Sequence, residues 1–481
     1  MAELVISAEG PKRVPIHIFI SDAVPPPADA LALLKQVATL ECVAAPVVAL
    51  PDLHYKPRLE TPSGVVTATQ DAVVLGLSSP SPGCGMALAR TALATEDMEE
   101  EQLDVFFAHL AKRLNPGRAQ QTLSPDEIID VLTHGAAAAV ARCGFDASLL
   151  EHIEDRGDAF AAAGVQVDAE AIARAVPAEL RQIGQREFGS VGRGNHFLEM
   201  QEVAEVVDEN VARAWGLHEG QVVVMFHADS GHLGAYVGRL YAHRRKNTWE
   251  GRLREWQYKF SLHVRKARSW AEIRRRWPYF SPQRWVPIQA NSEEGQLVLC
   301  ALRAATNYAY ANRVAVLAAI RDAMREAWGN DLPEPALLWD ATHNSIRREQ
   351  VDGRELWVHR HNVARAVPPS QMPPGSPFAR TGQPVLLPGT CRTSSYLCAA
   401  DEGAGRALFS VNHGAGRTAE QLAVPYDGGL TRLYGYAGEL EFLLSHLSDD
   451  GSQAVVQALQ ANTIARPVVR LRPLAVLKGL R

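Results

Sequence analysis

The sequence has 481 residues, of which 47% are hydrophobic and 21% charged, an ordinary globular composition. Its six cysteines are scattered without a CxxC pair, which argues against a disulfide framework and a zinc ribbon. No basic-then-apolar leader opens the chain and no apolar run is long enough to span a bilayer. We therefore expect a cytoplasmic protein with no membrane partner. Length alone would predict about two to four domains.

The predicted elements alternate between strands and helices. In chain order they are a β-like run at 14–20, a helix at 28–40, a buried strand at 43–50, helices at 96–114 and 125–143, and a long helix at 296–328. Ser124 begins a Ser-Pro-Asp-Glu signal typical of a helix start. Residues 366–384 are rich in Pro and Gly and are expected to form a loop. The alternation predicts an α/β or α+β class without a topology.

A basic and aromatic segment, residues 239–286, differs in composition from the rest of the chain. It holds fourteen Arg or Lys against three Glu, so the remainder carries a net charge of about -16. It also holds five of the nine tryptophans. Cations that follow phosphates and rings that stack on bases are suited to single-stranded nucleic acid. The alternative is a pair of amphipathic helices whose tryptophans pack on the body while the arginines face water.

Four segments place metal-ligand side chains beside glycines or at strand ends. Cys84 lies between two glycines, and His196 follows a glycine-rich stretch at 189–194. His227 ends the apolar run 222–226, and His343 follows the run 336–339. One thiolate and three imidazoles suit Mn, Fe, Co or Zn. Each histidine taken singly is more often a structural residue, and spacing in sequence does not show that they meet.

The segment His413-Gly-Ala-Gly-Arg417 combines a possible nucleophile with a glycine turn. Exposed backbone N–H groups around the imidazole can bind a phosphate, with Arg417 as a charged partner. A neutral imidazole can attack phosphorus to give a phosphoramidate. The alternative is a tight turn with a structural histidine. The glycine-containing loop 388–396 is another candidate phosphate contact.

Several of these motifs together resemble one family, the RtcB-type RNA ligases. The matching segments, in the family's order, are Pro51-Asp52-Leu53-His54, Gly83-Cys84-Gly85-Met86, Gly194-Asn195-His196-Phe197-Leu198-Glu199, Asn307-Tyr308-Ala309-Tyr310-Ala311-Asn312-Arg313, Val358-His359-Arg360, Arg365-Ala366, His413-Gly414-Ala415-Gly416-Arg417 and Arg472-Pro473-Leu474-Ala475-Val476-Leu477-Lys478-Gly479. They cover nearly the whole chain except the basic aromatic segment.

The resemblance implies a fold, an activity and cofactors. It implies an α+β fold in which residues 1–481 form a single catalytic domain with a central metal and nucleotide cleft, containing the segment at 239–286 as an arm. It implies a ligase that uses GTP and two Mn(II) ions to join an RNA 3′-phosphate, or a 2′,3′-cyclic phosphate after opening, to a 5′-hydroxyl. The family acts in tRNA splicing and RNA repair, so RNA ends and a possible accessory activator are the expected partners.

The resemblance also implies roles for individual residues. His413 would carry the guanylate, with Asp52 and Arg417 beside it in the catalytic set. The expected metal ligands are Cys84, His196, His227 and His343. The expected nucleotide contacts are Asn195, Glu199, Pro388, Gly389, Thr390, Ser395, His413, Gly414, Ala415, Gly416 and Lys478.

The chain departs from the family pattern near the second metal. Ser81 stands where the family has an aspartate ligand, which predicts a weaker or differently built second site. Asp229 shares a strand side with His227, so it could restore a carboxylate, and His232 could add an imidazole. Gly231 stands where the family has arginine, whereas two arginines replace glycines in loops near the phosphates, Arg193 and Arg392. These added cations could replace a metal's charge or block the nucleotide.

Two functions follow from these matches and departures. The first is a GTP-dependent RNA ligase or end-repair enzyme specialised by the arm. The second is a divergent paralogue that binds RNA ends with altered or lost ligation, as a binding module or a one-metal hydrolase. A plain metallohydrolase would leave the His413 loop and Lys478 without a role.

Overall fold

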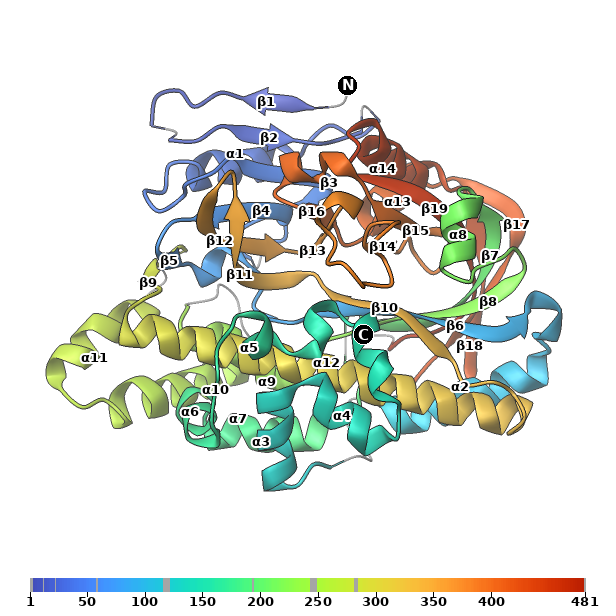
Figure 1. Ribbon diagram of the computed structural model, residues 1–481, viewed down its shortest axis with the longest axis horizontal. Helices are drawn as coiled ribbons and strands as arrows, with labels where there is room; N and C mark the ends of the chain where they lie inside the picture. Colours follow the sequence, from blue (N-terminus) through green and yellow to red (C-terminus); the bar gives the residue numbers. More distant parts are fainter. Residues whose placement is uncertain are drawn as a thin grey trace.

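The protein combines two β-sheets with a thick layer of helices, as a computed structural model shows (Figure 1). The structure describes residues 3–11, 13–21, 23–57, 59–115, 122–192, 194–242, 249–280 and 284–479, without the side chain of Asp427. The α+β expectation is confirmed, since the strands gather in sheets and most helices lie together below them. Among the described residues, no helix has both the length and the apolar character needed to cross a bilayer.

The smaller of the two main sheets has six strands and lies at the top of Figure 1. Its strands, in spatial order, are β1 (Leu4–Ile6), β2 (Ile16–Ile18), β3 (Val47–His54), β4 (Ser63–Thr69), β12 (Arg354–His361) and β11 (Asn344–Val351). Helix α1 (Ala28–Val37) buries its apolar side against this sheet, in a core shared with β2 and β3.

The larger sheet has nine strands and carries the ends on which the site is built. Its main order is β10 (Ala336–Thr342), β6 (Gly85–Ala94), β8 (Gln221–Ala228), β7 (Phe197–Val206), β19 (Ala465–Leu477), β15 (Ser395–Ala400) and β14 (Pro384–Leu387). Strand β17 (Pro425–Tyr434) joins β19 in parallel and pairs with β18 (Leu440–Leu447). Two small pairs complete the strands: β13 (Val363–Arg365) with β16 (Ser410–Asn412), and β5 (Ala72–Val73) with β9 (Ile288–Gln289).

Helix α12 (Glu293–Trp328) forms the centre of the helical layer. Ser292 caps its first turn by accepting a hydrogen bond from the Gly295 N–H, and the helix ends at Gly329, where φ is 92°. Its 36 residues span about 54 Å. The helices around it are α2 (Glu100–Leu114), α3 (Pro125–His134), α4 (Ala136–Cys143), α5 (Ala159–Ala162), α6 (Ala169–Ala175), α7 (Ala178–Glu187) and α9 (Gly231–Leu240).

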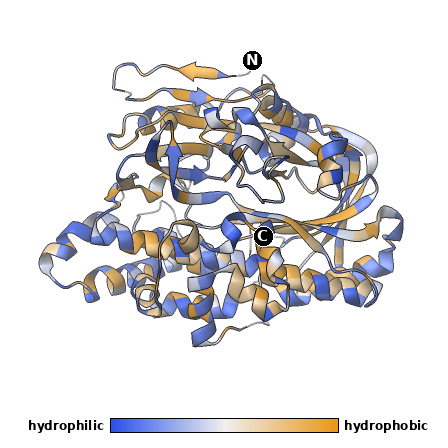
Figure 2. Cartoon of the chain, viewed as in Figure 1, coloured by the Kyte–Doolittle hydropathy of each residue, from blue (hydrophilic) through white to orange (hydrophobic). Residues whose placement is uncertain are grey.

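The largest apolar core joins these helices to the larger sheet, and a second core fills the space between the two sheets. On the far face of the larger sheet, α8 (Glu209–Ala214) covers a third. Helices α13 (Gly416–Leu422) and α14 (Asp450–Ala461) lie beside β3 and β19. Figure 2 shows hydrophobic residues concentrated along the strands and hydrophilic residues along the outer faces of the helical layer.

Most predicted elements are confirmed, with two corrections. The helix expected at 125–143 is two helices, because Gly135 adopts φ 57° between α3 and α4. The strand expected at 43–50 begins at Val47 and continues to His54. Ser124 forms the expected capping box with Glu127, and residues 366–384 are mostly loop.

The basic aromatic segment folds as α10 (Trp249–Phe260), a π-helical turn (Ser261–Arg265), α11 (Trp270–Arg276) and a 3-10 turn (Trp277–Phe280). Its residues 243–248 and 281–283 lie outside the described part of the chain. The alternative in which its tryptophans pack on the body is wrong for four of the five, because only Trp285 is half-buried, with its indole N–H bonded to Thr61.

Candidate metal centre and nucleotide cavity

One end of the larger sheet brings together a thiol and two imidazoles. Cys84 immediately precedes β6, His196 precedes β7, and His227 lies near the end of β8. Because these three strands are antiparallel neighbours, the start of β6 and β7 and the end of β8 meet at one edge. The Cys84 Sγ lies 3.1 Å from His227 Nε2 and 3.4 Å from His196 Nε2.

This cluster suits a borderline transition metal. The ligand atoms of Cys84, His196 and His227 all lie within 4.8 Å of one another. Burial holds the pKa of His227 well below its usual value, so its imidazole is neutral and offers a lone pair. The buried Nδ1 of His196 has no hydrogen-bond partner among the described residues. A buried cysteine beside two imidazoles is the donor set that Mn, Fe, Co or Zn would use.

His343 and His413 extend the cluster into a chain of rings. His343 follows β10, and its ring centroid lies 4.9 Å from that of His227 and 4.8 Å from that of His413. Burial lowers the pKa of His343 well below its usual value. Burial, with Lys56 and His54 nearby, lowers the pKa of His413 to about 3. His413 is therefore a neutral imidazole at physiological pH.

The carboxylate of Asp229 lies beside the cluster, next to Ser81. The Ser81 hydroxyl donates a 2.7 Å hydrogen bond to Asp229 Oδ2, which lies 3.7 Å from His196 Nε2. The Gly231 N–H donates to the other carboxylate oxygen at 2.8 Å and fixes its orientation. The suggestion that His232 joins the cluster is wrong, because its exposed ring is bonded to Glu187 instead.

The buried guanidinium of Arg313 supports the loops that carry the ligands. Its Nη1 donates to the carbonyls of Gly83 at 2.8 Å and Ala228 at 3.2 Å, beside Cys84 and His227. Its Nε donates to Asp340 Oδ1 at 2.6 Å. Arg313 therefore joins α12 to β6, β8 and β10 at the point where the cluster is assembled.

A cavity of about 750 Å³ opens next to the cluster and contains most of the residues predicted to bind nucleotide. His227 and His413 line it, so it communicates with the metal cluster. The predicted residues in its wall are Asp52, Asn195, Glu199, Pro388, Gly389, Thr390, Ser395, Gly414, Gly416, Arg417 and Lys478. Ala415 is the exception, since it is buried behind the loop and does not line the cavity.

Glu199 and Lys478 lie at the same wall because β7 and β19 are paired there, with Glu199 opposite Val476. Gln201 Nε2 donates to Glu199 at 2.5 Å and to Ser395 Oγ at 3.0 Å. Burial raises the pKa of Glu199 to about 8, and only Gln201 and Lys478 oppose that shift. The carboxyl is therefore largely protonated at neutral pH and ionises readily when a ligand presents N–H donors to it.

Asp52 adopts φ 66° and is hydrogen-bonded to the start of the helix that follows the His413 loop. Its Oδ1 accepts hydrogen bonds from the Thr418 N–H at 2.6 Å and from the Thr418 hydroxyl at 2.8 Å, at the start of α13. Burial raises the pKa of Asp52 to about 6. Arg417 is largely exposed, with Glu420 at 3.8 Å, and its side chain is free to turn towards a phosphate.

Sequence reasoning missed two cavity residues, His54 and Lys56. His54 is the last residue of β3 and Lys56 lies two positions further, so a basic residue just beyond the matched motif was the available signal. We suggested that Arg392 could replace a metal's charge or block the nucleotide. It does neither, because its guanidinium donates to the Ser445 carbonyl at 2.8 Å and does not line the cavity. Arg193 lies outside the described residues.

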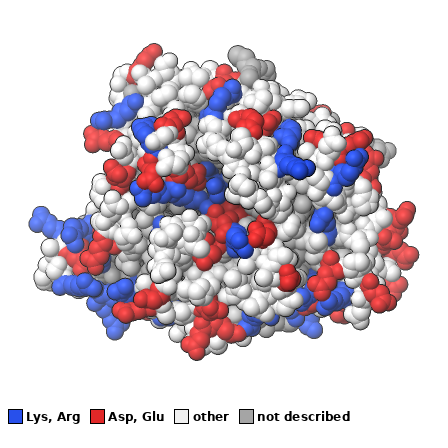
Figure 3. Space-filling model, viewed as in Figure 1, with Lys and Arg blue, Asp and Glu red and all other residues white. Residues whose placement is uncertain are grey.

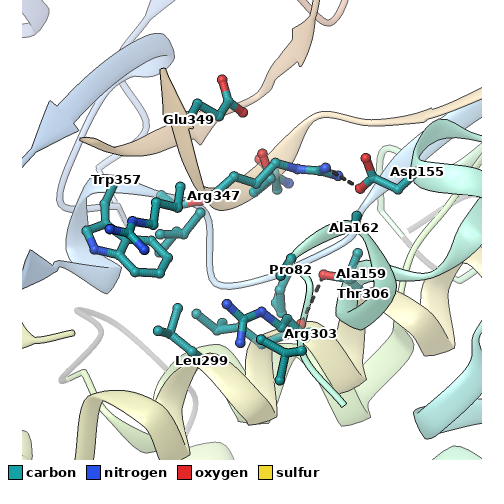
Figure 4. A pocket seen from close by; sticks show the side chains of 18 of the residues that line it. Pro82, Asp155, Ala159, Ala162, Leu299, Arg303, Thr306, Arg347, Glu349 and Trp357 are labelled. Carbon is teal, nitrogen blue, oxygen red and sulfur yellow. Dashed lines mark hydrogen bonds and ion pairs between the residues drawn. The ribbon is translucent and has the colours of Figure 1, made fainter. Parts of the chain in front are cut away.

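A second cavity, of about 550 Å³, is lined by residues that include Pro82 and Arg303 (Figure 4). Pro82 and Asn344, close in sequence to Cys84 and His343, form part of its wall. Most of its cations are neutralised, since Arg347 and Arg365 pair with Asp155 and Glu154, and Arg365 also approaches Glu349. The half-buried Arg303 of α12 projects into it and forms no ion pair with a described residue.

The sequence of the chain is similar to those of known proteins. Residues 33–424 match the family profile described as "tRNA-splicing ligase RtcB". The chain is 30% identical to a tRNA-splicing ligase RtcB of Thermococcus kodakarensis, over 97% of this chain and 95% of that protein. It is 32% identical to an RNA-splicing ligase RtcB of Mycobacterium tuberculosis, over 92% of this chain and 99% of that protein. A tRNA-splicing ligase RtcB of Pyrococcus horikoshii is 32% identical over 82% of this chain, which spans 44% of that longer protein.

Proposed function

Because this chain belongs to the RtcB family, we propose that it is an RNA ligase that joins 3′-phosphate and 5′-hydroxyl ends through a guanylylated His413. One observation carries the proposal: a neutral, half-buried imidazole lies between a Cys/His cluster and a cavity large enough for a nucleotide. GTP and Mn(II) are the proposed cofactors. A 2′,3′-cyclic phosphate end would first be opened to the 3′-phosphate.

The chemistry proceeds by three displacements at phosphorus. The His413 ring nitrogen attacks the α-phosphate of GTP, a P–N bond forms, and pyrophosphate leaves. An RNA 3′-phosphate oxygen then takes the guanylate from His413, which recovers its lone pair. Finally the 5′-hydroxyl attacks the activated 3′-phosphate, loses its proton and displaces GMP. The low pKa of His413 suits the first step, because the nucleophile needs no prior deprotonation above about pH 3.

The cluster residues would hold the metal. Cys84, His196 and His227 are the proposed central ligands, with His343 and Asp229 at the two sides. Bound there, Mn(II) would neutralise phosphate charge beside His413. The hydrogen-bonded pair Ser81–Asp229 supports this assignment, since it keeps a carboxylate at the place where the family's aspartate is missing.

The cavity walls would bind the nucleotide. Glu199 and Lys478 present an acceptor and a donor for a guanine edge, and Pro388, Gly389, Thr390, Ser395 and Gly414 would line the rest of the nucleotide site. Asp52 acts as a positioning residue that fixes the start of α13 and thereby the His413 loop. Arg417 would supply a mobile positive charge for the RNA phosphate.

Self-guanylylation tests the proposal directly. The protein is incubated with GTP labelled at the α-phosphate and Mn(II), then resolved by denaturing electrophoresis. We expect an acid-labile label that is absent in His413→Gln and retained in the control His134→Gln, an exposed histidine on α3. A label that survives His413→Gln, or no label on the unaltered protein, would overturn it.

The same assay separates the ligase from the divergent paralogue. Adding RNA with a 3′-phosphate and RNA with a 5′-hydroxyl should discharge the label and give a joined product. Labelled protein that binds both ends but never joins them would favour the paralogue.

A further inference from the structure

The arm, defined as residues 249–280, buries charged side chains and exposes tryptophans. Its interior holds Lys259, whose Nζ donates to the Ala242 and Tyr279 carbonyls at 2.8 Å and to Glu255 at 2.7 Å. Arg276 is also buried and pairs with Glu272 at 2.6 Å. The arm is therefore held together by these polar contacts and by buried side chains such as Leu262 and Tyr279, and its exposed tryptophans lie outside that core.

Four tryptophans lie on the outside of the arm. Trp249 is 78% exposed, Trp256 55%, Trp270 85% and Trp277 64%. Tryptophan is usually well buried, and a cluster of exposed rings marks an interaction surface. Trp256 stacks on Phe260 with centroids 5.2 Å apart and planes 18° apart, so the pair already forms a flat stacking platform.

Unpaired cations surround these rings. Exposed basic side chains that form no ion pair with a described residue are Arg254, Arg265, Lys266, Arg274 and Arg275. Figure 3 shows Lys and Arg gathered at the left end of the molecule, where Figure 1 places α10 and α11. A purely apolar partner would leave these charges without a counterion, whereas a polyanion with flat bases satisfies both the cations and the rings.

The second cavity lies along α12 and has polar side chains from that helix in its wall. The first three turns of α12, the next helix after the arm, contribute Gln296 and Arg303 to the second cavity. The opposite wall of that cavity contains Pro82 and Asn344, next to the metal cluster (Figure 4). A strand held on the arm and following α12 would meet Arg303, which forms no ion pair with a described residue.

We propose that the arm is a docking platform for single-stranded RNA, binding the tract next to the ends that are joined by stacking bases on its exposed tryptophans. This inference rests on the proposed function for its substrate class. The cations would follow the phosphates without reading sequence. The arm therefore adds affinity and substrate choice, and the chemistry at His413 does not depend on it.

Binding of a fluorescein-labelled single-stranded RNA, followed by anisotropy without GTP, tests the rings. We expect Trp256→Ala/Trp270→Ala/Trp277→Ala to bind roughly tenfold or more weakly, since each base stack lost weakens binding several-fold. The matched control is Phe442→Ala, an exposed ring on β18 at the other end of the molecule, with unchanged affinity. Wild-type affinity in the triple variant would overturn the proposal.

Salt dependence tests the cations. Arg274→Gln/Arg275→Gln should lower the slope of log affinity against log salt by roughly one to one and a half, as expected for two phosphate contacts on a single strand. Arg325→Gln, at the far end of α12 and paired with Glu334, is the control. An unchanged slope in the double variant would contradict the inference.

Two further readouts separate the possible failures. Self-guanylylation should be intact in all arm variants. Its absence in the unaltered protein would reject the proposed function, and the arm's RNA binding would then be judged by anisotropy alone. Sedimentation reports the oligomeric state. If the arm variants dissociate a dimer while RNA affinity stays constant, the platform joins two copies of this chain, and the RNA proposal is refuted.

Discussion

The Arg313–Asp340 pair provides a sharp test of what holds the metal cluster together. Neither side chain reaches solvent to any useful extent, with 0% and 2% of the side chain exposed. Arg313→Met keeps most of the apolar stem and removes the guanidinium. The Asp340 carboxylate then stays buried without its counterion, and two backbone carbonyls lose a donor.

The expected cost is large because a buried charge is left uncompensated. Removing one partner of such a pair lowers the free energy of unfolding by about 3–5 kcal/mol. The matched control is Arg348→Met, whose ion pair with Glu355 lies at the surface with 59% and 50% of the side chains exposed. Exposed pairs contribute up to about 1 kcal/mol, so Arg313→Met should lower the free energy of unfolding several-fold more than Arg348→Met does.

The pH dependence of the stability of Arg313→Met provides a second, independent test. Burial already raises the pKa of Asp340 to about 6 although Arg313 opposes the shift. Without Arg313 the pKa of Asp340 rises further. A carboxyl whose pKa is higher in the folded than in the unfolded protein stabilises the fold at low pH, and this stabilisation is lost as pH rises through the folded pKa. Arg313→Met should therefore be far more destabilised at pH 8 than at pH 5.

Urea unfolding at pH 5 and pH 8, followed by tryptophan fluorescence, measures both effects. Metal content by mass spectrometry should fall in the same variant, because Gly83 and Ala228 lose their common anchor. A loss in Arg313→Met no greater than that in Arg348→Met, or one independent of pH, would refute the reasoning.

Three other predictions concern the cavity and cluster. Asp229→Asn should lose one bound Mn(II), or bind it at least tenfold more weakly by calorimetry, and unchanged stoichiometry and affinity would exclude Asp229 as a ligand. GTP affinity should rise about tenfold between pH 7 and pH 9 as Glu199, with a pKa of about 8, ionises, and Glu199→Gln should remove that rise. Asp52→Ala should lower the free energy of unfolding by about 1–2 kcal/mol through lost contacts to Thr418, whereas Asp52→Asn should keep most of it; equal losses would contradict a positioning role.

The sequence predicted the parts of the site that depend on local pattern. The apolar run 222–226 predicted that His227 would end a buried strand, and β8 is that strand. The capping box at Ser124 and the long helix α12 were equally local. The break at Gly135 was missed because glycine inside a helical pattern is often tolerated, and only its φ of 57° ends the helix.

The parts of the site that depend on contacts between residues far apart in the chain were only partly predictable from the sequence. The hydrogen bond between Ser81 and Asp229 joins residues far apart in the chain, so spacing could suggest the compensation but not its geometry. The exposure of the arm's tryptophans could not be predicted from composition, because tryptophan is usually buried in folded proteins. Lys56 was missed because its position in the cavity depends on the path of the chain after β3.

Strand β19 has a consequence for how the molecule folds. It lies between β7 and β15 and also pairs with β17, so without it the larger sheet is three unconnected pieces, and Leu477 must find Leu198 across more than half of the chain. Such non-local pairing is slow, and it exposes the edges of β7, β15 and β17 until it is complete. The same pairing brings Lys478 to Glu199, so a nucleotide should bind only chains that have closed the sheet. GTP would then act as a folding ligand that pulls refolding towards the closed state by mass action.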